Sequence, residues 1–170
     1  NILALKGSIV TIDAMGTQRE IAAKIIDKEA DYLLALKGNQ GDLHLETKEA
    51  FERFSAKQKA LKHLDTDFGH GRIEERHCYV APAADFLSPQ LLKRWKGLQS
   101  IVKIEAYVTY KNGKQQGRQD FEERYYITSL AGQAQQINQA VRTHWGIETK
   151  LHWVLDIAFR EDDSRIRKGY

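Results

Sequence analysis

The stretch Ser8–Glu20, SIVTIDAMGTQRE, decides the fold class of this chain. Ile9–Ile12 forms a short, β-branched apolar run, which is typical of a strand buried on both faces inside an α/β sheet. The run ends on a carboxylate, Asp13. Thr17, with Glu20 three residues later, forms a capping-box pattern that predicts the start of a helix. The stretch therefore raises the question of why an apolar strand ends on an acid.

The residues after Asp13 predict a βαβ unit. Apolar residues at helical spacing indicate a helix over residues 17–30, with an inward face formed by Ile21, Ala22, Ile25 and Ile26. DYLLALKG, residues 31–38, predicts a second strand that ends in a Gly-Asn turn. A strand, a helix and a strand of these lengths form a parallel βαβ unit.

Helical patterns recur further along the chain. Residues 56–71 are expected to form the tail of a helix and then a polar loop. The last pattern is the longest and keeps helical spacing almost to the end of the chain. Besides the first, we expect three helices, at residues 41–54, 88–98 and about 133–160.

The middle of the chain is expected to be rich in strands. Two strands, Ile101–Tyr110 and Glu122–Ser129, flank the segment KNGKQQGRQD, which contains an Asn-Gly turn signal. We therefore expect an α/β fold in three parts. These are a first α/β part over residues 1–71, a β-rich part over residues 72–129 and a C-terminal helical part over residues 130–170.

Length and composition indicate one soluble globular domain. The chain has 170 residues, of which 42% are hydrophobic and 29% charged, and its net charge of +3 permits an anionic partner. No apolar run approaches the roughly 20 residues of a membrane span, and a single cysteine, Cys78, suits a reducing compartment. We expect a cytoplasmic protein without membrane association. The chain begins NILALKG, which is typical of a helix end, so we expect a piece of a longer protein.

A second acid, Glu148, is placed unusually on the last predicted helix. On a helical wheel it falls within the apolar arc, between Val141 and Leu155, and His144 falls there too. A carboxylate on a core-facing stripe is costly unless it is paired or binds a cation. The alternative is a glutamate at the edge of the stripe that reaches solvent or pairs with an arginine.

Asp13 and Glu148 together suggest a metal site. Ligands of open α/β sheets bind beyond the carboxyl ends of the strands, where Asp13 is expected. Two Mg²⁺ ions held by carboxylates can activate a nucleophile and stabilise a leaving oxygen in phosphoryl transfer. The alternative for Asp13 is a simple helix cap. Two carboxylates are few for two ions, and the sequence offers no strong third candidate on a strand.

Two blocks of the sequence resemble a known family. Residues 8–40, SIVTIDAMGTQREIAAKIIDKEADYLLALKGNQ, and residues 141–165, VRTHWGIETKLHWVLDIAFREDDSR, are similar to the DDE transposases of bacterial insertion sequences. The similarity is greatest to the branch of H-repeat-associated proteins. It implies a ribonuclease H-like core with an Asp-Asp-Glu metal triad, in which Asp13 is the second Asp and Glu148 is the Glu. The first Asp would then lie upstream of Asn1.

The resemblance also implies an insertion. Between Asp13 and Glu148 lie 134 residues, and related transposases place a β-rich insertion in this interval. The expected fold is therefore a ribonuclease H-like core, incomplete at its N-terminus, with the β-rich segment inserted between the second Asp and the Glu. Mg²⁺ or Mn²⁺ is the implied cofactor, with two ions expected only when the upstream Asp is present.

The chain departs from the Tyr-x2-Arg-x3-Glu-x6-Lys signature that related families carry around the Glu. Val141, His144 and Leu155 stand at the Tyr, Arg and Lys positions. Contacts to DNA phosphates must therefore come from other residues or be absent. The local candidates are Arg142, His144, Lys150 and His152. His144, Glu148 and His152 also share one helix face, so a transition-metal site is an alternative.

Other candidate DNA contacts lie outside the last helix. Lys37 and Asn39, in the turn after the second strand, are expected to touch phosphates beside the active site, although turn chemistry alone explains a Gly-Asn pair. Trp95 lies among basic residues in LKRWKGL, a pattern typical of nucleic-acid binding. The alternative is that Trp95 anchors an amphipathic helix.

These expectations lead to a functional hypothesis. The chain is a catalytic-core piece of a DNA transposase, whose longer parent cleaves and transfers DNA strands at transposon ends as a homo-oligomer. This piece alone is expected to be inactive, since one metal ligand lies elsewhere. The alternatives are a non-catalytic DNA-binding or assembly remnant of a decayed element, and a general Mg²⁺-dependent nuclease.

Overall fold

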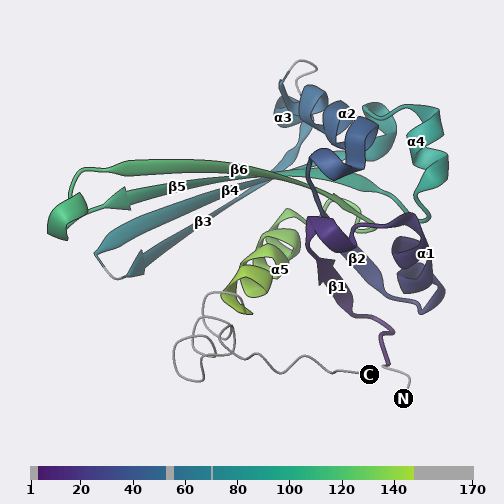
Figure 1. The fold of residues 1–170 in the computed structure, drawn as a ribbon, viewed down its shortest axis with the longest axis horizontal. Coiled ribbons are helices and arrows are strands. Elements are labelled where there is room, and N and C mark those ends of the chain that lie inside the picture. Colours follow the sequence, from purple (N-terminus) through teal and green to yellow (C-terminus); the bar gives the residue numbers. More distant parts are fainter. Residues whose placement is uncertain (1–3, 53–55, 70, 148–170) are drawn as a thin grey trace, which may run out of the picture.

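The computed structural model describes residues 4–52, 56–69 and 71–147. These residues form a mixed α/β fold around one sheet of six strands in the order β1-β2-β6-β5-β4-β3 (Figure 1). Only β1 and β2 run parallel, and every other neighbouring pair is antiparallel. Glu148, Lys150 and His152 lie outside the described residues.

The βαβ unit at the start of the chain is confirmed. It consists of β1 (Ile9–Ile12), α1 (Arg19–Asp27) and β2 (Asp31–Leu36), and Ile9 pairs with Asp31 in the parallel register. The expected burial holds for β2, which is buried on both faces, but β1 is only half-buried. The reason is that β1 is the edge strand of the described sheet.

The expected capping box at Thr17 is wrong. α1 begins at Arg19, and its N-cap residue Gln18 makes no side-chain cap bond. The hydroxyl of Thr17 instead donates to the carbonyl oxygen of Ala35, at 2.7 Å. Thr17 therefore ties the turn after β1 to the end of β2, and this tertiary bond replaces the local one that the sequence pattern predicts.

Four antiparallel strands form a long arm that projects from the body of the protein (Figure 1). Of the helix tail and polar loop expected over residues 56–71, the loop is wrong, because the segment contains a nine-residue strand that pairs along its whole length with the next one. α3 (Ala56–Lys59) precedes this strand. The arm strands are β3 (Leu61–Gly69), β4 (Arg72–Pro82), β5 (Ser100–Tyr110) and β6 (Gln119–Thr128).

The arm and the βαβ unit share one continuous sheet. The last residues of β6 pair with β2, in a register that places Thr128 opposite Leu33 and Tyr125 opposite Leu36. The division of the chain at residues 71 and 72 stays a prediction. That point lies in the turn between β3 and β4, which are hydrogen-bonded neighbours.

Helices cover both faces of the sheet, giving two apolar cores. α1, α2 (Gly41–Glu52) and α4 (Pro89–Arg94) pack on one face, where Tyr32, Leu34 and Leu36 of β2 point. α5 (Ala134–Ile147) packs on the other face, against Leu33 and Ala35. Four short 3₁₀ turns connect these elements, at Ala14–Gly16 (η1), Gly38–Gln40 (η2), Ala83–Asp85 (η3) and Gly113–Gln115 (η4).

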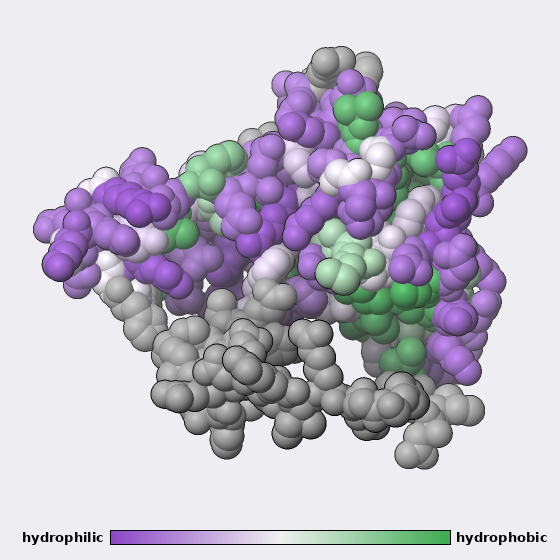
Figure 2. Space-filling view, in the orientation of Figure 1, coloured by the Kyte–Doolittle hydropathy of each residue, from purple (hydrophilic) through white to green (hydrophobic). Residues whose placement is uncertain are grey.

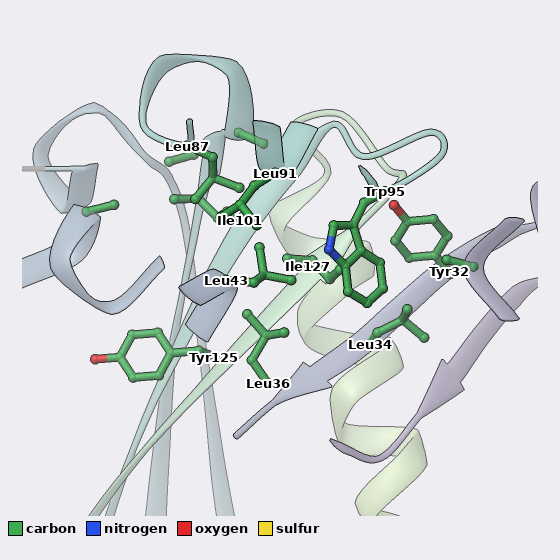
Figure 3. Packing of buried hydrophobic residues seen from close by; sticks show 14 of the residues in the cluster. Tyr32, Leu34, Leu36, Leu43, Leu87, Leu91, Trp95, Ile101, Tyr125 and Ile127 are labelled. Atoms are coloured by element: carbon green, nitrogen blue, oxygen red, sulfur yellow. The ribbon is translucent and has the colours of Figure 1, made fainter. Parts of the chain in front are cut away.

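Trp95 lies in the first of these cores. Its ring is 7% exposed and packs near Tyr32, Leu34 and Ile127 (Figure 3). We expect Trp95→Ala to lower the free energy of unfolding by about 3–5 kcal/mol, because it removes a large buried side chain and leaves a cavity. Trp95→Phe should cost markedly less. Denaturant unfolding of the two variants checks this order, and equal losses would contradict it.

Candidate functional site

Two strand ends converge at the candidate site. Because β1 and β2 are parallel neighbours, Asp13 after β1 and Lys37 after β2 lie at the same edge of the sheet. The Lys37 Nζ atom is 3.7 Å from Asp13 Oδ1. Both side chains are partly exposed, so this ion pair contributes little stability. The arrangement is the one expected for ligand binding beyond the carboxyl ends of strands.

Asp13 does not cap a helix. It precedes η1 with an extended backbone and makes no side-chain cap bond. Its Oδ1 atom is buried and accepts no hydrogen bond from any described residue. A buried carboxylate oxygen without a donor costs free energy. Local structure therefore does not explain this acid, and the unsatisfied oxygen suits a cation as its partner.

The backbone after Asp13 is held by the turn that follows β2. Asn39 Nδ2 and Gln40 Nε2 both donate to the carbonyl oxygen of Ala14, at 2.9 and 2.8 Å. Gln40 Oε1 in turn accepts a bond from the Lys37 amide. Gly16 completes η1, where an added Cβ would lie 2.5 Å from a methyl carbon of Ile12. These contacts fix the position of Asp13.

Asn39 therefore has a structural role here, and its expected contact with DNA stays a prediction. The sequence analysis did not single out Gln40. A sequence pattern that could have pointed to Gln40 is its position directly after the Gly-Asn turn at the end of a buried strand.

Asp13 borders a cavity of 380 Å³. Basic side chains around the cavity come from β2–η2, α2 and β6, and they include Lys37, Lys48 and Arg124. His44 lines it too, and burial together with the charge of Lys48 lowers the pKa of this imidazole, which stays neutral near pH 7. Three acidic side chains, those of Asp13, Glu122 and Glu123, line the cavity together with these cations, a combination suited to a phosphate ester with a divalent ion.

α5 places its expected DNA contacts elsewhere. His144 Nδ1 lies 3.1 Å from the hydroxyl oxygen of Thr11 on β1. Arg142 donates to Asp65, at 2.7 Å, and to Asp67, both on β3. Neither side chain lines the Asp13 cavity. Their contact with DNA stays a prediction, and in the described structure both are bonded to other parts of the chain.

Trp95 is largely buried, and its expected contact with DNA stays a prediction. Its burial at 7% agrees with the alternative that it anchors a helix, since the ring presents almost no face for stacking. Of the basic residues around it, Lys93 and Arg94 are exposed on the last turn of α4, and Lys96, which follows the helix, pairs with Asp27.

A stacked pair missed by the sequence analysis separates the Asp13 cavity from a second groove. The guanidinium carbon of Arg124 lies 3.6 Å from the ring centroid of Trp145, whose Nε1 donates to the Tyr126 hydroxyl. Both residues border the cavity and also the groove, which has a volume of 630 Å³. Four arginines line this groove, Arg72, Arg76, Arg124 and Arg142.

No cluster of three metal-ligating side chains occurs among the described residues. Glu122 and Glu123 line the same cavity as Asp13 but do not form such a cluster with it, and the other expected ligand in this chain, Glu148, lies outside the described residues. Mg²⁺ keeps several waters and needs few protein ligands, so one unsatisfied carboxylate at a polar cavity is compatible with it.

Comparison with known proteins identifies the family. The family described as "Transposase DDE domain" matches residues 1–169. The chain belongs to this family. The expected resemblance to H-repeat-associated transposases is also confirmed, because "H repeat-associated putative transposase YhhI" of Escherichia coli K12 is 39% identical over 176 residues.

Other relatives of this DDE-domain chain give the same result. "Putative transposase YncI" of Escherichia coli O157:H7 is 42% identical over 171 residues, which cover 99% of this chain and 43% of the relative. For YhhI the match covers 99% of this chain and 44% of the relative. The chain thus spans less than half the length of these relatives. No solved structure matches it, and no described helix is long and apolar enough to span a membrane.

Proposed function

We propose that this chain supplies the second and third carboxylates, Asp13 and Glu148, of a metal site that cleaves and joins DNA strands at transposon ends. One observation carries the proposal for Asp13. Its Oδ1 atom is buried at the carboxyl end of β1 and accepts no hydrogen bond from any described residue, and with the Lys37 ammonium 3.7 Å away it suits a cationic partner. Family membership supports the reaction class.

We further propose that the described sheet is part of a ribonuclease H-like core. β1 has a partner on one side only among the described strands. In Figure 2 apolar side chains gather over β1 and α1, where Val10, Ile12 and Ile21 are only partly buried. An upstream strand that carries the first Asp would complete the sheet at this edge and cover these side chains.

The residues of the chain have distinct parts in this reaction. Asp13 and Glu148 would hold the divalent ion, Mg²⁺ or Mn²⁺. When bound, the ions supply activation of the attacking oxygen and stabilisation of the leaving one. Lys37 balances the charge of Asp13 before DNA binds, and with Lys48 and Arg124 it would then contact phosphates. Asn39 and Gln40 keep the Asp13 backbone in place.

We propose DNA as the partner and a homo-oligomer as the active form. The proposed location is the cytoplasm, on the nucleoid when the protein is bound to DNA.

Mn²⁺ titration of ¹⁵N-labelled protein tests the metal site without requiring catalysis. We expect paramagnetic broadening centred on the amides of η1 and η2, because both turns adjoin Asp13. Asp13→Asn should abolish it. Asp120→Asn is the matched control, since Asp120 pairs with Arg118 at the tip of the arm. Broadening around η1 that survives Asp13→Asn would contradict the proposal.

A further inference from the structure

α5 touches both edges of the sheet. It packs against β1, the first strand in the sheet order, and against β3, the last. A flat sheet of six strands is about 24 Å wide, whereas a helix with its side chains is about 10–12 Å across. The sheet therefore curls around α5, and Figure 1 shows β1 and β3 on opposite sides of this helix.

Besides apolar packing, a hydrogen bond joins α5 to β1 near the end of the helix. His144 Nδ1 and the Thr11 hydroxyl oxygen are 3.1 Å apart, and both groups are partly buried. The bond joins two positions next to the proposed metal ligands. In the sequence, Thr11 precedes Asp13 by two residues and His144 precedes Glu148 by four.

The attachment to β3 lies on the same turn of α5. Arg142 uses one terminal nitrogen for Asp65 and the other for Asp67. Such two-nitrogen contacts with carboxylates are directional as well as strong. A separate bond, from the buried Asn138 to His63 Nδ1, holds the first half of α5 to the same strand.

We propose that His144 and Arg142 are positioning residues, which together set the location of the C-terminal end of α5, and so of Glu148, relative to Asp13. This inference rests on the proposed function. It assigns no DNA contact to either residue. His144, at the position of the signature arginine, fastens the helix to the Asp13 strand, and Arg142 fastens it to the opposite edge. His144 Nδ1 and both terminal nitrogens of Arg142 bond to groups of the protein itself.

The first test measures the attachment itself, independently of metal. We expect His144→Leu to increase hydrogen exchange of β1 and the last turns of α5, while His144→Asn restores protection, because its amide reaches the place of Nδ1. Thr11→Val should match His144→Leu, and the double variant should add nothing further. Additive effects of the two changes would overturn the role of this bond.

The second test connects His144 to Glu148 through Mn²⁺ affinity, measured by the broadening of η1 amides. We expect Glu148→Gln to weaken binding about 10-fold in the wild-type background and to have no further effect after His144→Leu. Asn138→Leu is the matched control. It breaks a bond of the same helix, lowers Tm by a similar amount and should leave Mn²⁺ affinity unchanged.

The outcomes separate this inference from the proposed function. An equal effect of Glu148→Gln in both backgrounds would overturn the positioning role of His144 and leave the metal site standing. No effect of Glu148→Gln in the wild type would contradict the proposed ligand, while the exchange data would still decide whether the bond holds α5 to β1.

A third comparison decides the role of Arg142. If Arg142 positions α5, we expect Arg142→Met to lower Mn²⁺ affinity, and neutralising its partners with Asp65→Asn and Asp67→Asn should cause the same loss. If Arg142 binds DNA, the same double change frees its guanidinium and strengthens binding of a duplex oligonucleotide, measured by fluorescence anisotropy. The second result, with Mn²⁺ affinity intact, would overturn the inference.

Discussion

We expect Asp13→Asn to lower metal-dependent DNA strand cleavage by about 10³-fold or more, in a protein that joins this chain to the upstream segment of a relative. The amide keeps the shape of the carboxylate but removes its charge, so it binds a divalent ion poorly. Metal ions contribute several kcal/mol to phosphoryl transfer, and each 1.4 kcal/mol is about a factor of ten. Nicking of a labelled transposon-end duplex in Mg²⁺ or Mn²⁺ measures the loss.

The same variant should fold at least as well as the wild type. Oδ1 of Asp13 is buried without a hydrogen bond, and its ion pair with Lys37 is weak. Removing the charge therefore relieves a cost. We expect an unchanged or slightly higher Tm, which shows that lost cleavage is not lost structure. Cleavage within tenfold of the wild type would contradict the assignment of Asp13, and cleavage by the 170-residue chain alone would contradict the need for an upstream ligand.

The largest effect on stability is expected at Lys103 on β5. Its side chain is 9% exposed, and its Nζ atom lies 2.9 Å from Glu123 and 3.2 Å from Glu105, whose side chain is 5% exposed. Burial acts to lower the pKa of Lys103, but its hydrogen bonds to Glu123 and Glu105 outweigh this and raise it. The bond to Lys103 lowers the pKa of Glu123.

Lys103→Met should lower the free energy of unfolding by about 3–5 kcal/mol, because Glu105 then stays buried without this cation. That is a large share of the roughly 5–15 kcal/mol typical of a domain. Thermal unfolding should show a Tm about 10 °C lower. Lys103→Met combined with Glu105→Leu should recover most of the loss. Lys96→Met, which breaks an exposed pair with Asp27, is the control and should change stability by less than about 1 kcal/mol.

Because of these two pKa shifts, the stability that Lys103 and Glu123 contribute to the fold depends on pH. The lowered pKa of Glu123 contributes stability above about pH 4.3, which is lost as the pH falls through the folded value. The raised pKa of Lys103 contributes stability below about pH 10.4, which is lost in stronger alkali. Unfolding of Lys103→Met should depend less on pH at both ends than unfolding of the wild type.

The sequence was sufficient to predict the elements that bury apolar runs. β1, α1 and β2 follow from such runs, and α5 follows from its helical spacing. β3 was missed because Leu61–Gly69 is an edge strand with mostly exposed side chains, so it lacks the apolar alternation by which strands are recognised. Its pairing with β4, a tertiary contact, makes it a strand.

The candidate site, too, could be predicted only in part from the sequence. Asp13 could be found because an acid that ends an apolar run is conspicuous, and the resemblance gave it a role. The contacts around it could not be found, because they join residues far apart in the chain. Thr17 bonds to Ala35 rather than capping α1, and Arg124 of β6 stacks on Trp145 of α5. The bonds of His144 to β1 and of Arg142 to β3 could not be found either, because a helical wheel does not show the curled sheet around α5.

Because the arm strands and β2 belong to one continuous sheet, movement of the arm is coupled to the end of β2. Residues 119–124 of β6 run beyond the end of β2, about 20 Å at the rise of an extended strand. The same strand then pairs with β2, where Tyr125 lies opposite Leu36, the residue before Lys37. A force applied to the hairpin tip, at Gly113–Gln115, is thus carried without a hinge loop to the strand end beside Asp13.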